Sequence, residues 1–196
     1  MDNIRIGNLR TNTEEISHML RAWIAISLAF AIILSEDLLS LSFTKMLLIS
    51  LGTVGLGFLL HELAHKVVAQ HYHFSAEFRA NNLMLVLAIL MSFFGFIFAA
   101  PGAVVIKASY IHPSKNGKIS LAGPLTNIVL ALVFFALVPL LEEIALYGAL
   151  INLWLAIFNL IPVWNLDGKK VLAWSKTAYI LTLLGAIGLL VVYYLV

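Results

Sequence analysis

The sequence predicts an all-α polytopic membrane protein with about five to six transmembrane helices and one re-entrant segment or short membrane-associated β region. The first observation behind this prediction is composition. Of the 196 residues, 62% are hydrophobic and 11% are charged, whereas soluble domains are roughly half apolar and about one quarter charged. The second is that the apolar residues form long uninterrupted runs, which no surface-and-core pattern explains. We therefore expect a single membrane-embedded domain over residues 1–196.

Polar joints separate the apolar runs, and each run predicts one element. The runs cover residues 22–34 (extendable to 41), 46–60 (continuing as a helix to about 70), 83–106, 119–141, 144–163 and 177–196. The last three are each close to the ~20 residues that cross ~30 Å of hydrocarbon. We expect a central core at about 46–170 and peripheral helices at about 20–41 and 175–196.

Lysine and arginine in the joints predict the orientation, because these residues favour the cytoplasmic side of short loops. By this rule the N-terminus and the joints at 107–118 and 164–176 are cytoplasmic, and the joint at Glu142 and Glu143 is outside. The basic residues behind the assignment are Arg5, Arg10, Arg21, Lys66, Arg79, Lys107, Lys115, Lys118, Lys169, Lys170 and Lys176.

The run at 83–106 conflicts with a simple crossing, because both of its flanks would then be cytoplasmic. We expect it to re-enter the membrane and return. Gly95 and the Pro101-Gly102 pair interrupt the run, and residues 103–106 are suited to a short strand. Non-helical backbone at this depth requires protein or a water-filled cavity to satisfy its hydrogen bonds. An ordinary spanning helix with a basic outer joint is the alternative, since the charge rule is statistical.

Two histidines and a glutamate lie in the second run as His61-Glu62-Leu63-Ala64-His65. Residues four apart share a helix face, so both imidazoles can reach one metal ion while Glu62 lies beside it. This pattern is typical of metal-assisted hydrolysis, in which the carboxylate takes a proton from the attacking water. Ionisable side chains inside a membrane segment are costly and therefore mark a functional site. A hydrogen-bonded structural cluster and a metal site without catalysis are the alternatives.

A third ligand is required, because catalytic zinc usually has three protein ligands. The chain has no cysteine, so that ligand is a carboxylate or a histidine. Asp167 is the best candidate, since it follows the fifth run on the expected cytoplasmic side and its neighbour Gly168 permits a close approach. Glu77 lies in a polar joint, and Glu142 and Glu143 belong to the opposite side. A helix cap or surface turn is the alternative for Asp167.

These residues carry a resemblance to a known family. The histidine motif at 61–65 in an apolar helix, followed by a segment with Asn159, Pro162, Leu166, Asp167 and Gly168, resembles the site-2 protease family of intramembrane zinc metalloproteases. The second segment is similar to that family's N-x-x-P-x-x-x-L-D-G motif, whose aspartate is the third zinc ligand. The resemblance spans residues 61–168.

A third element, between those two motifs, is similar to the family's G-x-x-x-N sequence, with Gly123 and Asn127 at its ends. It would place Asn127 near the site, where the side chain orients the substrate or stabilises the developing oxyanion. An interhelical hydrogen bond is the alternative for Asn127. Lys169 and Lys170 depart from the family's usual residues after Asp-Gly, and no PDZ-like insertion is present. The absence of that insertion indicates a minimal, microbial-type member.

The resemblance implies one zinc ion per chain, held by His61, His65 and Asp167, with Glu62 as the catalytic base. It also implies that the substrate is a membrane-spanning protein, cut from a site that opens to the cytoplasm of a microbial cell. We expect Gly123, Asn159, Pro162 and Gly168 to support the site, with Asn159 and Pro162 kinking the chain to aim Asp167. A substrate segment would pair as an extended strand with an edge at residues 101–106.

A membrane metal transporter or metal-sensing protein with the same ligands is the competing hypothesis. It would carry several ionisable residues along a path, and repeated halves would support it. Neither feature is visible in the sequence. The net charge of +2 is too small to indicate a nucleic-acid partner, so the expected partners are the lipid bilayer and the substrate.

Overall fold

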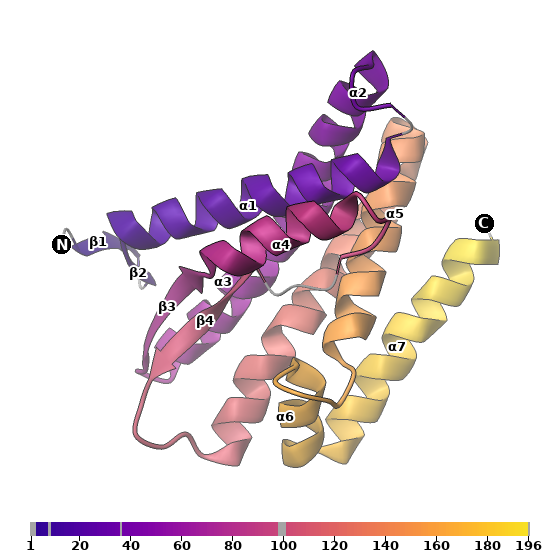
Figure 1. Ribbon diagram of the computed structural model, residues 1–196. Helices are drawn as coiled ribbons and strands as arrows, with labels where there is room; N and C mark the ends of the chain where they lie inside the picture. Colours follow the sequence, from indigo (N-terminus) through magenta and orange to yellow (C-terminus); the bar gives the residue numbers. More distant parts are fainter. Residues whose placement is uncertain (1–2, 8, 36, 98–100, 196) are drawn as a thin grey trace. The chain divides into compact units, whose positions relative to one another are not determined.

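The computed structural model describes residues 3–7, 9–35, 37–97 and 101–195. The chain divides into two compact units, one of Met1–Leu59 with Ala76–Ile106 and one of Leu60–Ser75 with Lys107–Val196. The elements in chain order are β1 (Asn3–Ile6), β2 (Leu9–Asn12), α1 (Thr13–Leu34), α2 (Leu41–Ser50), a π-helical turn η1 (Leu51–Gly55), α3 (Leu56–His71), β3 (Ser75–Ala80), α4 (Asn82–Ser92), β4 (Gly102–Lys107), α5 (Pro113–Asn159), α6 (Asp167–Trp174) and α7 (Lys176–Leu195) (Figure 1). The expected single domain stays a prediction.

The first unit begins with an antiparallel hairpin that leads into α1. In β1 and β2, residue 6 pairs with residue 9, and Gly7 between them has a φ of +59°. The Asn12 side chain then caps α1 by accepting the backbone N–H of Glu15 at 2.8 Å. This cap starts the helix at Thr13, well before the apolar run at 22–34 from which we predicted it.

One edge of the small β3–β4 sheet is covered by side chains of α1. Glu15 accepts the backbone N–H of Phe78 at 2.7 Å, and His18 Nδ1 accepts the backbone N–H of Ala80 at 3.1 Å. Nearby, Phe78 packs into a buried apolar cluster of the same unit. That cluster contains Ala22, Ala25, Ile26, Phe58, Phe78 and Leu85.

The run at 83–106 forms a short helix and a strand, which bears out the predicted short β region. α4 has 11 residues, or about 16 Å of helix, and is too short to cross ~30 Å of hydrocarbon alone. β4 covers residues 102–107 and so includes the expected strand. Residues 98–100 of this run lie outside the described residues, as does residue 36 in the first expected helix.

In the second unit, α5 is a helical hairpin. Its 47 residues reverse direction at Glu142, whose φ of 38° and ψ of −111° are not helical, so two arms run back along each other (Figure 1). A Cβ placed on Gly148 would lie 2.5 Å from the ring of Phe134, which shows how closely the arms pack. The two arms correspond to the runs predicted at 119–141 and 144–163.

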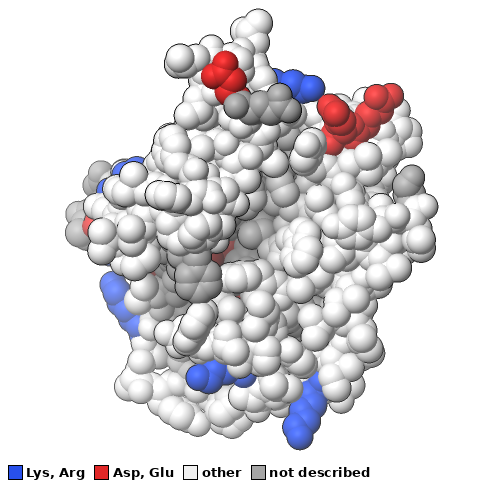
Figure 2. Space-filling view, turned by 45° about the vertical axis from the view of Figure 1, so that its right-hand side comes forward, with Lys and Arg blue, Asp and Glu red and all other residues white. Residues whose placement is uncertain are grey.

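The helices identify a membrane protein. Among the described residues, four helices are long and apolar enough to cross a bilayer: α1, the continuous Leu41–His71, α5 and α7. Counting α5 as two arms gives five segments, in agreement with the predicted five to six. Figure 2 shows a face made mostly of uncharged side chains.

Lys66, which we used as a loop charge in assigning orientation, is only 1% exposed. It is therefore an interior residue and carries no information about which side of the membrane this end of the helix faces.

Candidate metal centre

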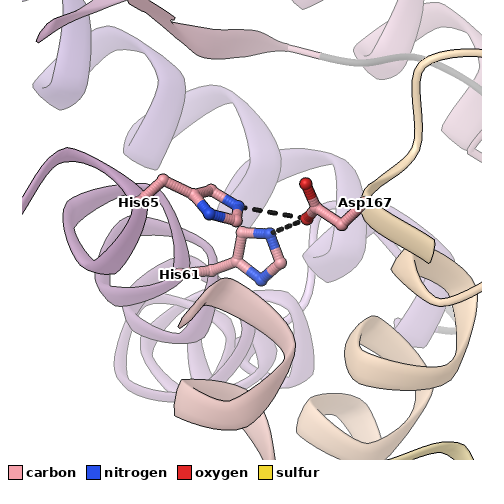
Figure 3. A group of neighbouring side chains, drawn as sticks. All are labelled: His61, His65 and Asp167. Atoms are coloured by element: carbon pink, nitrogen blue, oxygen red, sulfur yellow. Dashed lines mark ion pairs between the residues drawn. The ribbon is translucent and has the colours of Figure 1, made fainter. Parts of the chain in front are cut away.

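The candidate site lies within the second unit and starts from two histidines one turn apart on α3. His61 and His65 are buried, 4% and 8% exposed. Their ring centroids are 4.6 Å apart, as expected for residues on one helix face. Both rings direct Nε2 to the same side, toward the first residue of α6 (Figure 3).

That residue is Asp167. Its Oδ2 lies 3.2 Å from Nε2 of His61 and 3.1 Å from Nε2 of His65 (Figure 3). The three ligand atoms are all within 4.8 Å of one another, and all three residues are buried. The structure thus brings together the three predicted ligands, in an arrangement that can hold a metal ion. Two imidazoles and one carboxylate match the donor set of a catalytic zinc site.

The remaining nitrogen of each ring is fixed by a hydrogen bond. His61 Nδ1 lies 2.6 Å from Oδ1 of Asn127, and His65 Nδ1 lies 2.8 Å from the backbone carbonyl of Ile119. Both oxygens accept, so each Nδ1 carries the proton and donates it. Nε2 of each ring, which faces Asp167, is therefore the nitrogen that can bind a metal ion once it has given up its proton.

Asn127 belongs to a chain of amides that joins the two arms of α5. Its Nδ2 donates to Oδ1 of Asn152 at 2.9 Å, and Nδ2 of Asn152 donates to the carbonyl of Gly148 at 2.9 Å. Asn127 and Asn152 are fully buried. Its carboxamide oxygen faces His61, and its bond to Asn152 joins the two arms, as in the interhelical alternative. The expected role of Asn127 toward the substrate stays a prediction. Asn152 and the Ile119 carbonyl were not predicted.

Two glycines allow backbone to approach the ligands closely. A Cβ on Gly123 would lie 2.5 Å from Nε2 of both His61 and His65, so α5 passes directly against the ligand face. A Cβ on Gly168 would lie 2.0 Å from the carbonyl oxygen of Leu160. Only glycine fits at these two positions, and the second brings the start of α6 against the end of α5.

The carboxylate of Asp167 is held in its charged form. Burial would raise the pKa of Asp167, but the charges and hydrogen bonds of His65 and His61 outweigh burial and hold that pKa below its usual range. Asp167 is therefore ionised at neutral pH and available as a ligand. Its other oxygen, Oδ1, lies 3.9 Å from Nζ of Lys170 on the next turn of α6.

The other predicted residues lie on α3, at the end of α5 and in the connection between α5 and α6. Glu62 follows His61 on α3 and is 8% exposed. The amide of Asn159 donates to the carbonyl of Leu155 in its own helix, at 2.9 Å. Pro162 lies in the connection between α5 and α6, in an exposed segment of irregular backbone. This connection leads from the end of α5 to Asp167.

A search of curated proteins matched one from Methanocaldococcus jannaschii, named "Putative zinc metalloprotease MJ0611". The two sequences are 47% identical over 148 residues, which cover 72% of this chain and 78% of that protein. No protein-family model matches the chain, and no solved structure matches it either.

Proposed function

Since the chain belongs to the zinc metalloprotease family of its archaeal relative, we propose that it is an intramembrane endopeptidase of the site-2 protease type. It would cut peptide bonds within or near the transmembrane segments of membrane proteins. Zinc is the metal that the family takes, and the group of His61, His65 and Asp167 can hold it.

The observation that carries the proposal is where the metal-binding group sits. His61, Glu62 and His65 lie on Leu41–His71, a continuous helical stretch of 31 residues that is apolar enough to cross a membrane. His61, His65, Glu62 and, from α6, Asp167 are all buried. Burying ionisable side chains in a membrane protein is costly in free energy unless they form a functional site. A protease that cuts inside the bilayer needs its metal in this position, whereas a soluble metalloprotease does not.

The reaction would be hydrolysis with Glu62 as the general base. Bound zinc supplies Lewis-acid activation of the water and of the scissile carbonyl. Glu62 accepts the proton of the attacking water and then passes it to the leaving amine. Asn127 and the Ile119 carbonyl hold the histidine rings in the required tautomer, so Asn127 is a positioning residue.

The substrate would be a transmembrane protein segment that unwinds before it is cut, because the carbonyls of an intact helix are held by its own hydrogen bonds. An added strand on β4 would replace those bonds. The edge of β3 is engaged by Glu15 and His18, so we propose β4, which overlaps the edge predicted at residues 101–106, for this pairing. We propose that the N-terminus and the opening of the site are cytoplasmic, from the lysines at 107–118 and 169–176.

The proposal is tested by comparing the wild type with Glu62→Gln, both purified in detergent, on a model transmembrane substrate. Cleavage and bound zinc are measured in each. We expect the wild type to cut and Glu62→Gln to keep its zinc without cutting, because glutamine preserves the shape of the side chain but cannot act as the base.

A metal transporter or sensor is the competing hypothesis that this experiment separates. Such a protein would bind zinc in both forms and cut none of several substrates. In the part of the chain that the structure describes, one group of three His or carboxylate ligands is found, whereas a transport path would use several. A wild type that binds no zinc would contradict both functions.

A further inference from the structure

A groove of about 290 Å³ lies beside the metal centre in the second unit. One wall has Ile111, in the connection before α5, and Pro113, at the start of α5. The other wall is a face of α6 with Lys169 and Lys170. Trp164, in the connection that leads to Asp167, also lines it. We call this feature the lysine groove.

Lys170 links the lysine groove to the metal centre. Its side chain lines the groove, and its Nζ lies 3.9 Å from Oδ1 of the ligand Asp167. A chain segment bound in the groove would therefore lie next to the ligand carboxylate. The groove is then in a position to hold substrate residues close to the bond that is cut.

All the charged side chains that line the lysine groove are positive. None of its lining residues is acidic, and among the described residues Lys169 has no hydrogen bond or ion pair. Lys170 shares its charge with Asp167, whereas the ammonium group of Lys169 has no acidic counter-charge among the described residues. The free charge of Lys169 attracts an anion, and the low-dielectric walls strengthen that attraction.

The remaining lining favours a peptide as the source of that anion. Ile111, Pro113 and Ala173 are apolar, and Trp164 is a large aromatic residue that is 67% exposed. The side-chain amides of Asn116 and Asn165 complete the lining and can bond to peptide groups. An extended segment with an acidic side chain next to apolar ones matches all three features.

We propose that the lysine groove is a specificity subsite, which selects substrates with a glutamate or aspartate in the polar flank beside the cut. This inference rests on the proposed proteolysis and adds a substrate preference to it. Lys169 and Lys170 act as the specificity-determining residues, and the preference is electrostatic.

The test uses zinc-loaded full-length protein in neutral detergent, with pairs of model substrates that differ only by Glu or Gln. The Glu is moved through successive positions of the polar flank, and kcat/KM is measured for each pair. At one or two adjacent positions we expect Glu to be preferred by about two- to fivefold, as for a partly exposed charge pair. Lys169→Gln should abolish this preference, and Lys169→Glu should reverse it in favour of a substrate carrying Lys at the same position.

Lys176→Glu is the matched control, because it makes the same charge change at the start of α7, outside the groove. It should leave the Glu preference as in the wild type. Equal rates for Glu and Gln at every position would overturn the inference while leaving proteolysis intact, as would an equal reversal in Lys176→Glu. A preference that appears only after anionic phospholipid is added would overturn it too, by assigning the groove to lipid headgroups. If no substrate is cut at all, the proposed function itself fails.

Discussion

Asn127 is the residue at which the metal centre can be weakened without removing a ligand. Its Oδ1 accepts from His61 Nδ1 at 2.6 Å, so Asn127→Leu keeps the volume but loses the bond that fixes the ring. We expect zinc affinity to fall by about 10- to 100-fold, the usual cost of losing such a partner. The measurement is competition for zinc with a chelator of known affinity.

Thr126→Val is the control for Asn127. The Thr126 hydroxyl donates to the carbonyl of Ala122 in its own helix, so its loss should leave zinc affinity unchanged. If Asn127→Leu binds zinc as tightly as Thr126→Val, then Asn127 does not position His61, and the substrate-directed role expected from the sequence becomes the better explanation.

Gly123 tests how tightly α5 packs on the ligands. Because a Cβ there would lie 2.5 Å from both Nε2 atoms, Gly123→Ala must displace the imidazoles or the helix. A shift of about 1 Å at a reacting centre costs on the order of 100-fold in rate, so we expect that loss of cleavage together with reduced zinc content by metal analysis. Gly185→Ala on α7, where a Cβ meets no atom within 4 Å, should retain both. Full activity in Gly123→Ala would show that the centre has more room than this geometry allows.

The sequence predicted the three side chains that the structure brings together, because their signals are local. His61 and His65 are four residues apart on one helix, and Asp167 was marked by the motif around it. Asn152 carries no such spacing, since it reaches the site only through the folding of α5 into a hairpin. The Ile119 carbonyl is a backbone group, which no side-chain pattern reveals. The intramembrane amide of Asn152 was nevertheless a usable signal, because a polar group in an apolar run requires a partner.

Glu15 joins three elements of the first unit, and its energetic role should be measurable. It is buried and accepts from the Thr11 hydroxyl at 2.8 Å and from the Phe78 N–H at 2.7 Å. Glu15→Ala leaves both donors without this acceptor. We expect the free energy of unfolding to fall by about 2–4 kcal/mol, which is measured as a lower midpoint of thermal unfolding in detergent.

The neighbouring glutamate is the comparison. The Glu14 side chain is 41% exposed and pairs with Arg79 at 2.6 Å, and exposed pairs contribute about 1 kcal/mol or less. Equal destabilisation by Glu14→Ala and Glu15→Ala would mean that the buried bonds of Glu15 contribute no more to stability than a surface ion pair.

The apolar runs predicted the helices, but hydropathy alone missed how several elements begin and end. α1 begins at a polar N-terminal turn with Glu14 and Glu15, which an apolar run cannot reveal. β4 was predicted from the β-branched residues at 104–106, whereas β1, β2 and β3 are short and depend on pairing with other segments. The reversal at Glu142 contains neither glycine nor proline at the turn itself, so only the charged joint between two apolar runs indicated it.

At the scale of the whole molecule, the composition predicted a membrane protein and the helices agree. The orientation in the membrane cannot be compared with the helices in the same way, because it depends on the chain's charges relative to a bilayer rather than on internal contacts. The predicted orientation used Lys66 as one of its basic residues, and Lys66 is buried. The remaining lysines of the 107–118 and 169–176 joints still favour the cytoplasm, and this prediction can be tested directly.

The absence of cysteine from the chain makes each introduced thiol a unique label. Tyr110→Cys, in the exposed connection between β4 and α5, should react with a membrane-impermeant maleimide only after the cells are permeabilised. Glu143→Cys, beside the reversal of α5, should react in intact cells, because the two arms carry the chain from one side of the membrane to the other and back. The opposite labelling pattern would invert the topology and place the basic joints outside. Equal labelling of both positions in intact cells would mean that both joints lie outside, so that the first arm of α5 does not separate them across the membrane.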